Sequence, residues 1–348
     1  MLRSDKTVLV TGGSGFVAIH AIGQLLTLGY RVRTTVRSSK SRDKVLEMLR
    51  YDGIADLDSI DFIETDLTED KNWDKAMEGC LYVLHIASPI FLRLPKNEDE
   101  MIRPAVDGTL RVLKAASDAG VKRVVMTSNF GAVGYSHRDR NSLITEESWT
   151  DPKEKGLSAY NKSKVLAERA AWDFMEKERR TLELSVINPM GIFGPSLSAD
   201  LSSGFGLLQK VLDGSMKSIP DIRLGIVDVR DVADLHIRAM ESDVAKGQRF
   251  LALSGGTMSL LEIVVLLKAK LPQAAAKASL KPMPTWMVRL AALFNKQAKA
   301  ILPLVGIYRN ASNDKAKKLL DWNPRSNEEA ILATVESMIK WGAIKTEQ

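Results

Sequence analysis

The sequence predicts an α/β fold, in which a doubly wound parallel sheet is joined to a smaller, mainly helical lobe. Three observations lead to this prediction. Short strand patterns alternate with helix patterns, a glycine turn follows the first strand pattern, and a long helix pattern comes after the fifth. Strands that alternate with helices favour a parallel sheet covered on both faces, with ligands at the carboxyl ends of the strands.

The composition is that of a soluble globular protein. The chain has 348 residues, of which 45% are hydrophobic, and this is enough for a large core in one or two domains. Its only cysteine, Cys80, excludes a disulfide within the chain and suits a reducing compartment. The four histidines have no metal-ligand spacing, so we expect no metal.

The charge pattern does not indicate a nucleic-acid partner. The net charge is +6, but the basic residues are interspersed with 43 acidic residues and form no dense block. No apolar run approaches the ~18 residues that a membrane span needs, and the N-terminus lacks a signal-peptide pattern. We expect a cytoplasmic protein, monomeric or homodimeric, that binds neither nucleic acid nor a membrane.

The first strand pattern, residues 6–11, leads directly into a glycine turn. Gly12 and Gly15 permit a tight turn and bring backbone N–H groups close to a phosphate. The helix pattern that follows would direct its N-terminus at a pyrophosphate. We therefore expect a Rossmann-type domain in which Gly12, Gly15, Phe16 and Val17 bind a dinucleotide.

The second strand pattern, residues 31–36, ends at a basic residue. An NAD site usually has a carboxylate there, whereas this chain has Arg37, followed by Lys40, Arg42 and Lys44. Cations suit a 2′-phosphate, and arginine can bind it with two parallel hydrogen bonds. We prefer NADP(H), bound by Arg37 and Lys44, over the alternative of a solvated basic loop.

Three more strand patterns follow in order, at residues 61–65, 81–86 and 123–127. A long helix pattern, from about residue 98 to 119, separates the last two and ends at Gly120. The order strand, helix, strand continues the predicted parallel sheet.

The next helix pattern contains Tyr160 and Lys164, four residues apart, so both side chains should leave the same face. A phenol with a pKa near ~10 is a poor acid at neutral pH unless a neighbouring cation favours its ionised form. Lys164 can supply that charge. The alternative, an ordinary surface pair, is the more common meaning of an isolated Y-x-x-x-K motif, so other motifs have to decide.

Several further motifs accompany this pair. They are T-G-G-S-G-F-V-A from Thr11, T-T-V-R from Thr34, D-L from Asp66, H-I-A-S-P from His85, Y-N-K-S-K from Tyr160, N-P-M-G-I-F-G-P from Asn188 and V-D-V-R-D-V-A from Val227. The set resembles the extended short-chain dehydrogenases/reductases. More narrowly, it is similar to the branch of dihydroflavonol reductases, cinnamoyl-CoA reductases and microbial aldehyde reductases. The resemblance covers nearly the whole chain but does not identify the substrate.

The resemblance implies a role for each matching residue. Tyr160 would donate a proton to a carbonyl oxygen, and Lys164 would ease that transfer and hold the nicotinamide ribose. The remaining cofactor contacts would be Asp66 and Leu67 at the adenine, Ala87 and Ser88 at the middle, and Pro189 and Ile192 at the nicotinamide.

One position departs from the family pattern. The family loop after the fifth strand usually reads T-S-S, whereas this chain has Thr127, Ser128 and Asn129. An amide can donate a hydrogen bond to the substrate oxygen as a hydroxyl does, so we expect Asn129 to be the catalytic donor. The alternatives are that Ser128 takes over, or that the protein binds cofactor without turnover.

After Pro195 the pattern changes. We expect a strand at residues 222–229, helices at 232–240, 259–270 and 313–320, a strand at 250–253, and a buried helix pair within 281–309. The helix at 259–270 should begin with an S-L-L-E capping box. The predicted domains are 1–188 with 223–245 for NADP, and 189–222 with 246–348 for the substrate.

The sequence thus predicts an NADPH-dependent reductase of an aldehyde or ketone, with a small-molecule carbonyl substrate. Two alternatives remain open at this point. One is a non-catalytic protein that senses NADPH, and the other is an NAD-dependent sterol or nucleotide-sugar dehydrogenase or epimerase, against which Arg37 argues.

Overall fold

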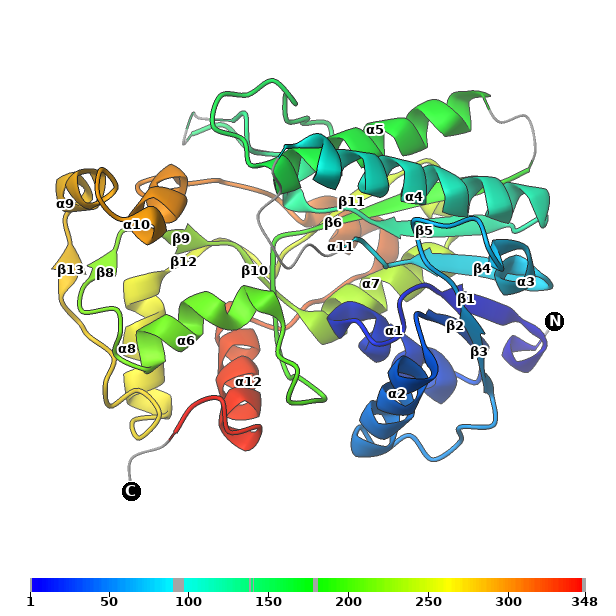
Figure 1. The fold of residues 1–348 in the computed structure, drawn as a ribbon, viewed down its shortest axis with the longest axis horizontal. Coiled ribbons are helices and arrows are strands. Elements are labelled where there is room, and N and C mark those ends of the chain that lie inside the picture. The colour runs from blue at the N-terminus through cyan, green and yellow to red at the C-terminus, as the bar shows by residue number, and fades with distance from the viewer. Residues whose placement is uncertain (1, 90–96, 138, 140, 178–180, 346–348) are drawn as a thin grey trace.

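A seven-stranded parallel sheet forms the centre of the computed structural model (Figure 1), which describes residues 2–89, 97–137, 139, 141–177 and 181–345. The strand order is β11-β6-β5-β4-β1-β2-β3. The strands are β1 (Thr7–Val10), β2 (Arg31–Val36), β3 (Ile60–Glu64), β4 (Cys80–His85), β5 (Arg123–Thr127), β6 (Glu183–Pro189) and β11 (Arg249–Ala252). This is the doubly wound order, so the predicted fold class is confirmed.

Helices cover both faces of this sheet (Figure 1). They are α1 (Phe16–Thr27), α2 (Ser39–Tyr51), α3 (Trp73–Met77), α4 (Asp99–Asp118), α5 (Ala159–Lys177), α7 (Val229–Glu241) and α11 (Asp314–Leu320). Strand β5 shows why two layers are needed, because Val124 and Met126 pack with α4 and α5 while Val125 packs with α1 and α7. Alternate side chains of a strand point to opposite faces, so both faces must be covered.

A second cluster of buried residues forms the smaller lobe. Its helices are α6 (Gly206–Leu212), α8 (Leu260–Lys270), α9 (Thr285–Ala291), α10 (Lys296–Ile301) and α12 (Asn327–Lys340). Short strands pair as β7 (Gly191–Phe193) with β10 (Ile226–Asp228), β9 (Arg223–Leu224) with β12 (Met258–Ser259), and β8 (Ile219–Pro220) with β13 (Pro282–Met283). Short 3-10 helices lie at Arg3–Asp5, Phe130–Ala132, Ser203–Phe205, Asp243–Ala245 and Leu302–Leu304.

The predicted capping box of α8 is confirmed. The Ser259 hydroxyl accepts from the backbone N–H of Glu262, and the Glu262 carboxylate accepts from the backbone N–H of Ser259.

The domain boundaries stay a prediction. Phe16 packs against the buried clusters of both the main sheet and the smaller lobe, so the two share contacts at the glycine turn.

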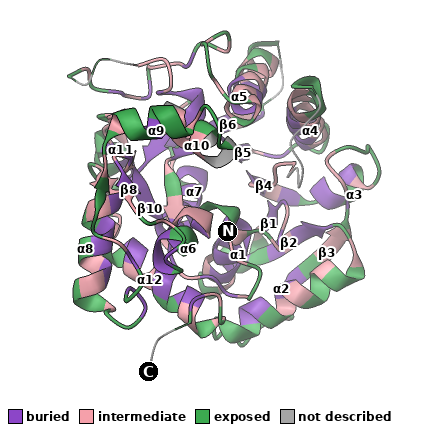
Figure 2. Cartoon of the chain, turned by 60° about the vertical axis from the view of Figure 1, so that its left-hand side comes forward, coloured by how far each residue is buried: buried purple, intermediate pink, exposed green. Residues whose placement is uncertain are grey.

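The structure corrects two predicted elements. The expected strand at 222–229 is split into β9 and β10 at Gly225, where Met190 packs so closely that a Cβ would lie 2.1 Å from its sulfur. The prediction that the helix pair within 281–309 is buried is wrong. Helices α9 and α10 form, but they are short, and Trp286 and Phe294 are 65% and 87% exposed. Much of α9 has the colour of exposed residues (Figure 2).

Within the described residues, no helix combines the length and apolarity that a membrane span requires.

Candidate active site

The glycine turn between β1 and α1 leaves backbone at the surface of the site. Gly12 has a φ of +72°, and a Cβ there would lie 3.0 Å from the Cβ of Ala87. Gly15 occupies the N-cap position of α1, and no side chain caps this end of the helix. The first-turn N–H groups, which include those of Phe16 and Val17, can therefore bind a phosphate.

Thr11 joins the glycine turn to the end of β4. Its hydroxyl oxygen accepts from the backbone N–H groups of Ile86 and Ala87, at 3.0 and 2.9 Å. It also lies 3.1 Å from Nδ1 of His85, to which its own O–H can donate. Complete burial lowers the pKa of His85 to about 3, so the ring is a neutral acceptor. This arrangement holds Ala87 beside Gly12.

The end of β2 presents an exposed cation. Arg37 is exposed, and no ion pair joins it to any residue in the described part of the chain. Asp66 lies close enough for the charge of Arg37 to act on it, although hydrogen bonds from Thr68 are the main cause that lowers the pKa of this carboxyl. The ammonium of Lys44 is instead 2.6 Å from the carboxylate of Asp200, so its predicted cofactor role stays a prediction.

Tyr160 and Lys164 lie on one face of α5, as their spacing predicts. The Lys164 ammonium is 5.9 Å from the centre of the Tyr160 ring. Tyr160 is 49% exposed, whereas Lys164 is 7% exposed. The phenol is thus accessible to a substrate, and the cation beside it is held in the protein.

A pocket brings four of the predicted residues together. Its lining includes Leu67, Ala87 and Ser88 together with Lys164. Thr127 at the end of β5 also contributes. Predicted residues from three separate motifs therefore meet at the carboxyl ends of β4 and β5, where an α/β sheet binds its ligands.

Asn129 and Ser128 differ in accessibility. Ser128 is 2% exposed, and its hydroxyl is buried without a hydrogen-bond partner among the described residues. Asn129 is partly exposed, and its Oδ1 is the buried end of the amide. A Cβ on Gly131 would lie only 2.8 Å from that oxygen, so the loop packs closely here.

A buried polar network lies beneath Asn129. Glu168 accepts from Nε of Arg249 at 2.6 Å and from Nδ2 of Asn188 at 2.7 Å. The same Nδ2 lies 3.3 Å from the backbone oxygen of Asn129. The guanidinium of Arg249 also stacks on Trp149, with its carbon 3.7 Å from the ring centre. The network links α5, β6 and β11 to the loop that carries Asn129.

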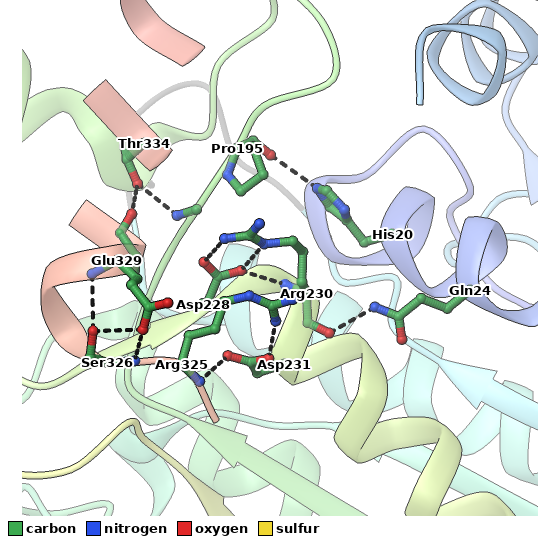
Figure 3. A network of polar contacts seen from close by, with 12 residues as sticks. His20, Gln24, Pro195, Asp228, Arg230, Asp231, Arg325, Ser326, Glu329 and Thr334 are labelled. Carbon is green, nitrogen blue, oxygen red and sulfur yellow. Dashed lines mark hydrogen bonds and ion pairs between the residues drawn. The ribbon is translucent and has the colours of Figure 1, made fainter. Parts of the chain in front are cut away.

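A second network fixes α7 to the start of α12 (Figure 3). Asp228, fully buried, accepts from Nε and Nη2 of Arg230 at 2.8 and 2.7 Å. Asp231 accepts from the backbone N–H of Arg325 at 2.7 Å and from its guanidinium. Burial raises the pKa of the Asp231 carboxyl. These residues give the V-D-V-R-D-V-A motif a structural role.

The same region holds the glycine-turn helix α1 (Figure 3). Gln24 donates to the backbone oxygen of Arg230 at 2.8 Å, and Nε2 of His20 lies 3.0 Å from the backbone oxygen of Pro195. Helix α1 is therefore bonded both to α7 and to the segment that follows β7. These bonds help to position the glycine turn at the join between the sheet and the smaller lobe.

Acid should destabilise the protein through its buried histidines. Nδ1 of His236 lies 2.7 Å from the backbone oxygen of Val232 and Nε2 lies 2.6 Å from the hydroxyl of Thr127, and burial lowers the ring's pKa to about 4. Between about pH 6.5 and pH 4, the histidine is protonated in the unfolded state but neutral in the folded state. The free energy of unfolding therefore decreases as the pH falls through this range. At pH 5 this histidine alone should cost about 2 kcal/mol relative to pH 7.

Urea unfolding at pH 7 and pH 5 measures this effect. His236→Gln should lower stability at pH 7 but shrink the loss between the two pH values. An equal loss in both proteins would show that His236 does not contribute.

Sequence reasoning missed Glu168, Arg249 and the role of Asn188. A signal was available for Glu168, because it follows Tyr160 and Lys164 at the same spacing of four and so shares their face of α5. Arg249 had none, since it meets Glu168 only after the sheet has formed. The described residues contain no group of three or more side chains that could hold a metal ion.

Comparisons with known proteins agree with this geometry. Residues 9–249 match the model of the 3-beta hydroxysteroid dehydrogenase/isomerase family. A putative NADPH-dependent methylglyoxal reductase of Candida albicans is 37% identical over 293 residues, which are 78% of this chain and 85% of that protein. A cinnamoyl-CoA reductase of Medicago truncatula is 33% identical over 339 residues, 96% of this chain and 95% of that protein.

A solved structure extends the similarity to the whole fold. The yeast methylglyoxal/isovaleraldehyde reductase Gre2, complexed with NADPH, has a TM-score of 0.81 with 26% sequence identity. The alignment covers 97% of this chain and 99% of the yeast chain.

Proposed function

We propose that this chain reduces an aldehyde or ketone with Tyr160 as proton donor. The chain belongs to the 3-beta hydroxysteroid dehydrogenase/isomerase family of extended short-chain dehydrogenases/reductases. It is an NADP-dependent oxidoreductase. The family description names steroids, but the curated relatives include a putative methylglyoxal reductase and a cinnamoyl-CoA reductase, so the family does not decide the substrate.

The residues of this chain fit the cofactor. No side chain caps α1, a Cβ on Gly12 would crowd that of Ala87, and Arg37 is exposed without an ion pair in the described part. When bound, the reduced dinucleotide supplies the hydride for the carbonyl carbon. We assign the pyrophosphate to the glycine turn and the 2′-phosphate to Arg37.

The observation that carries the proposal is the accessible Tyr160 beside the buried Lys164. Tyr160 can donate its proton to the carbonyl oxygen as that oxygen gains negative charge, and the ammonium of Lys164 lies beside the phenol from which the proton leaves. Asn129 would donate a second hydrogen bond to the same oxygen. The proton is thus supplied at the oxygen while the carbon is reduced.

The assignment of Asn129 over Ser128 makes a separate prediction. Asn129→Ala should lower kcat by about 10²-fold, because it removes a donor aimed at the developing oxyanion. Ser128→Ala is the matched control and should leave kcat within about threefold, since its hydroxyl is buried. Steady-state kinetics on both variants decides the question. The reverse pattern would make Ser128 the donor.

Arg37 should determine the preference for NADP. Arg37→Gln should raise the Kd of NADPH by about 10- to 100-fold while changing that of NADH by less than about threefold, because only NADPH carries the 2′-phosphate. Arg50→Gln, an exposed arginine at the far end of α2, is the control. Equal losses for both cofactors after Arg37→Gln would contradict the assignment.

The reaction itself is tested by a panel of aldehydes, ketones and 1,2-dicarbonyls mixed with the protein and NADPH. Loss of the reduced-nicotinamide absorbance is the expected result. A protein that binds NADPH tightly but oxidises it with no carbonyl would instead fit a regulatory NADPH sensor, the alternative that Asn129 leaves open. Asn129→Ser would then reveal a lapsed enzyme if it restored turnover.

A further inference from the structure

The segment from Val305 to Ala311 runs between the smaller lobe and the main sheet (Figure 1). Val305 forms an isolated bridge with Ile222 of the lobe, and Ala311 forms one with Ile144, in the connection between β5 and α5. Arg309 therefore lies where the two parts of the molecule meet. Such borders are a preferred location for small-molecule sites.

Arg309 differs from the other arginines of this protein that are not exposed. In the described part, each of the others has a carboxylate oxygen within 3.9 Å of a guanidinium nitrogen. These arginines are Arg33, Arg111, Arg123, Arg223, Arg230, Arg238, Arg249 and Arg325. Arg309 has no ion pair with any described residue, and its Nε is buried without a hydrogen-bond partner. A half-buried cation without a counterion is costly, which makes a ligand the natural source of the missing charge.

The guanidinium is held in a defined position. Its carbon lies 4.1 Å from the centre of the Tyr135 ring, a stacking distance. Tyr135 is fixed by a 2.9 Å hydrogen bond from its backbone N–H to the hydroxyl of Thr150. Burial of Arg309 lowers the pKa of its own guanidinium, but the guanidinium stays protonated at physiological pH. The cation is therefore both charged and oriented.

Tyr135 connects this cation to the candidate active site. The ring of Tyr135 lies 6.3 Å from that of Phe130, the residue after Asn129, and packs in the same cluster as Met190, which follows the end of β6. The ring of Tyr135 thus lies between Arg309 and the loop that carries Asn129, the proposed oxyanion donor. A substrate whose carbonyl oxygen is at Asn129 could extend its other end toward Arg309.

We propose that Arg309, stacked on Tyr135, binds a carboxylate at the far end of the carbonyl substrate. This inference rests on the proposed reductase function and gives it a substrate class, aldehydes or ketones that also carry a carboxylate. A planar guanidinium matches a carboxylate with two parallel hydrogen bonds. Its single charge suits a monoanion better than a phosphate dianion.

The test compares two substrates of nearly the same shape, 4-formylbenzoate and its neutral methyl ester. With NADPH, the wild type should have a kcat/KM for the acid at least about tenfold higher than for the ester. Arg309→Gln should abolish that preference and leave the ester within about twofold, while Arg309→Lys should retain part of the preference. Arg289→Gln, an exposed arginine on α9, should behave as the wild type. A wild type without preference for the acid, or a preference that survives Arg309→Gln, overturns the proposal.

A binding measurement separates this inference from the reductase function. Calorimetry on the NADP-loaded protein should detect unreactive benzoate binding to the wild type and at least about tenfold weaker binding to Arg309→Gln. If no carbonyl is reduced, the reductase function falls while this comparison still decides the anion site. Should Arg309→Gln fail to fold, Arg309→Lys and Tyr135→Leu carry the same comparison. Benzoate binding that is equal in wild type and variants, or absent from the wild type, contradicts the site.

Discussion

Tyr160→Phe should lower kcat for carbonyl reduction by about 10²- to 10⁴-fold, the range that a positioned general acid contributes. The variant loses only the hydroxyl, and Tyr160 is 49% exposed, so neither the fold nor the position of Lys164 depends on it. The Kd of NADPH should therefore stay within about threefold of the wild type, because binding energy that does not depend on the transition state is retained.

Tyr51→Phe is the matched control. Tyr51 is also partly exposed, at 39%, but lies on α2. Steady-state kinetics and cofactor fluorescence titration on both variants give kcat and Kd. A Tyr160→Phe enzyme that keeps its wild-type kcat would show that the proton comes from another group.

Arg249→Met should lower the free energy of unfolding by about 3–5 kcal/mol, the usual effect of removing one partner of a buried ion pair. Glu168 is fully buried, and the Arg249 side chain is 8% exposed. Without the guanidinium, the carboxylate keeps its hydrogen bond from Asn188 and a long contact of 3.4 Å from Nε1 of Trp172. That is too little to stabilise a charge away from water.

Two further variants make this prediction specific. Arg238→Met breaks an ion pair with Asp234 that is more than a third exposed, together with hydrogen bonds to the backbone oxygens of Leu320 and Asp321, and should cost about 1–2 kcal/mol. The double variant Arg249→Met with Glu168→Gln removes both charges and should recover part of the loss. Urea unfolding measures all of them. Equal costs for Arg249→Met and Arg238→Met would mean that burial of the network contributes nothing.

The main sheet was predictable because its signals are local. Strand patterns such as residues 31–36 and 123–127 coincide with β2 and β5, and the glycine turn lies between β1 and α1 as expected. Residues 123–127 are buried over most of their length, and a strand buried on both faces leaves a readable run of apolar residues. The spacing of Tyr160 and Lys164 predicts their shared face for an equally local reason.

The rest depends on contacts between distant segments. Glu168 and Arg249 are 81 positions apart and meet only when β11 joins the sheet. The break at Gly225 lies where the distant side chain of Met190 packs against the backbone, and no local pattern near 225 reveals that contact. The apolar residues of α9 predicted a buried helix, but the helix has seven residues, and among them only Val288 is buried in the core. Arg309 is conspicuous only once the partners of the other arginines are known.

The most direct test of carbonyl reduction follows the hydride itself. The protein is incubated with NADPH deuterated at the transferred C4 position and with the carbonyl compound that it consumes fastest, and the alcohol product is analysed by mass spectrometry. We predict that one deuterium appears on the carbinol carbon with the wild type and that the labelled alcohol is nearly absent with Tyr160→Phe. Alcohol formed without the label, or no alcohol from any carbonyl while NADPH remains bound, would contradict hydride transfer at this site.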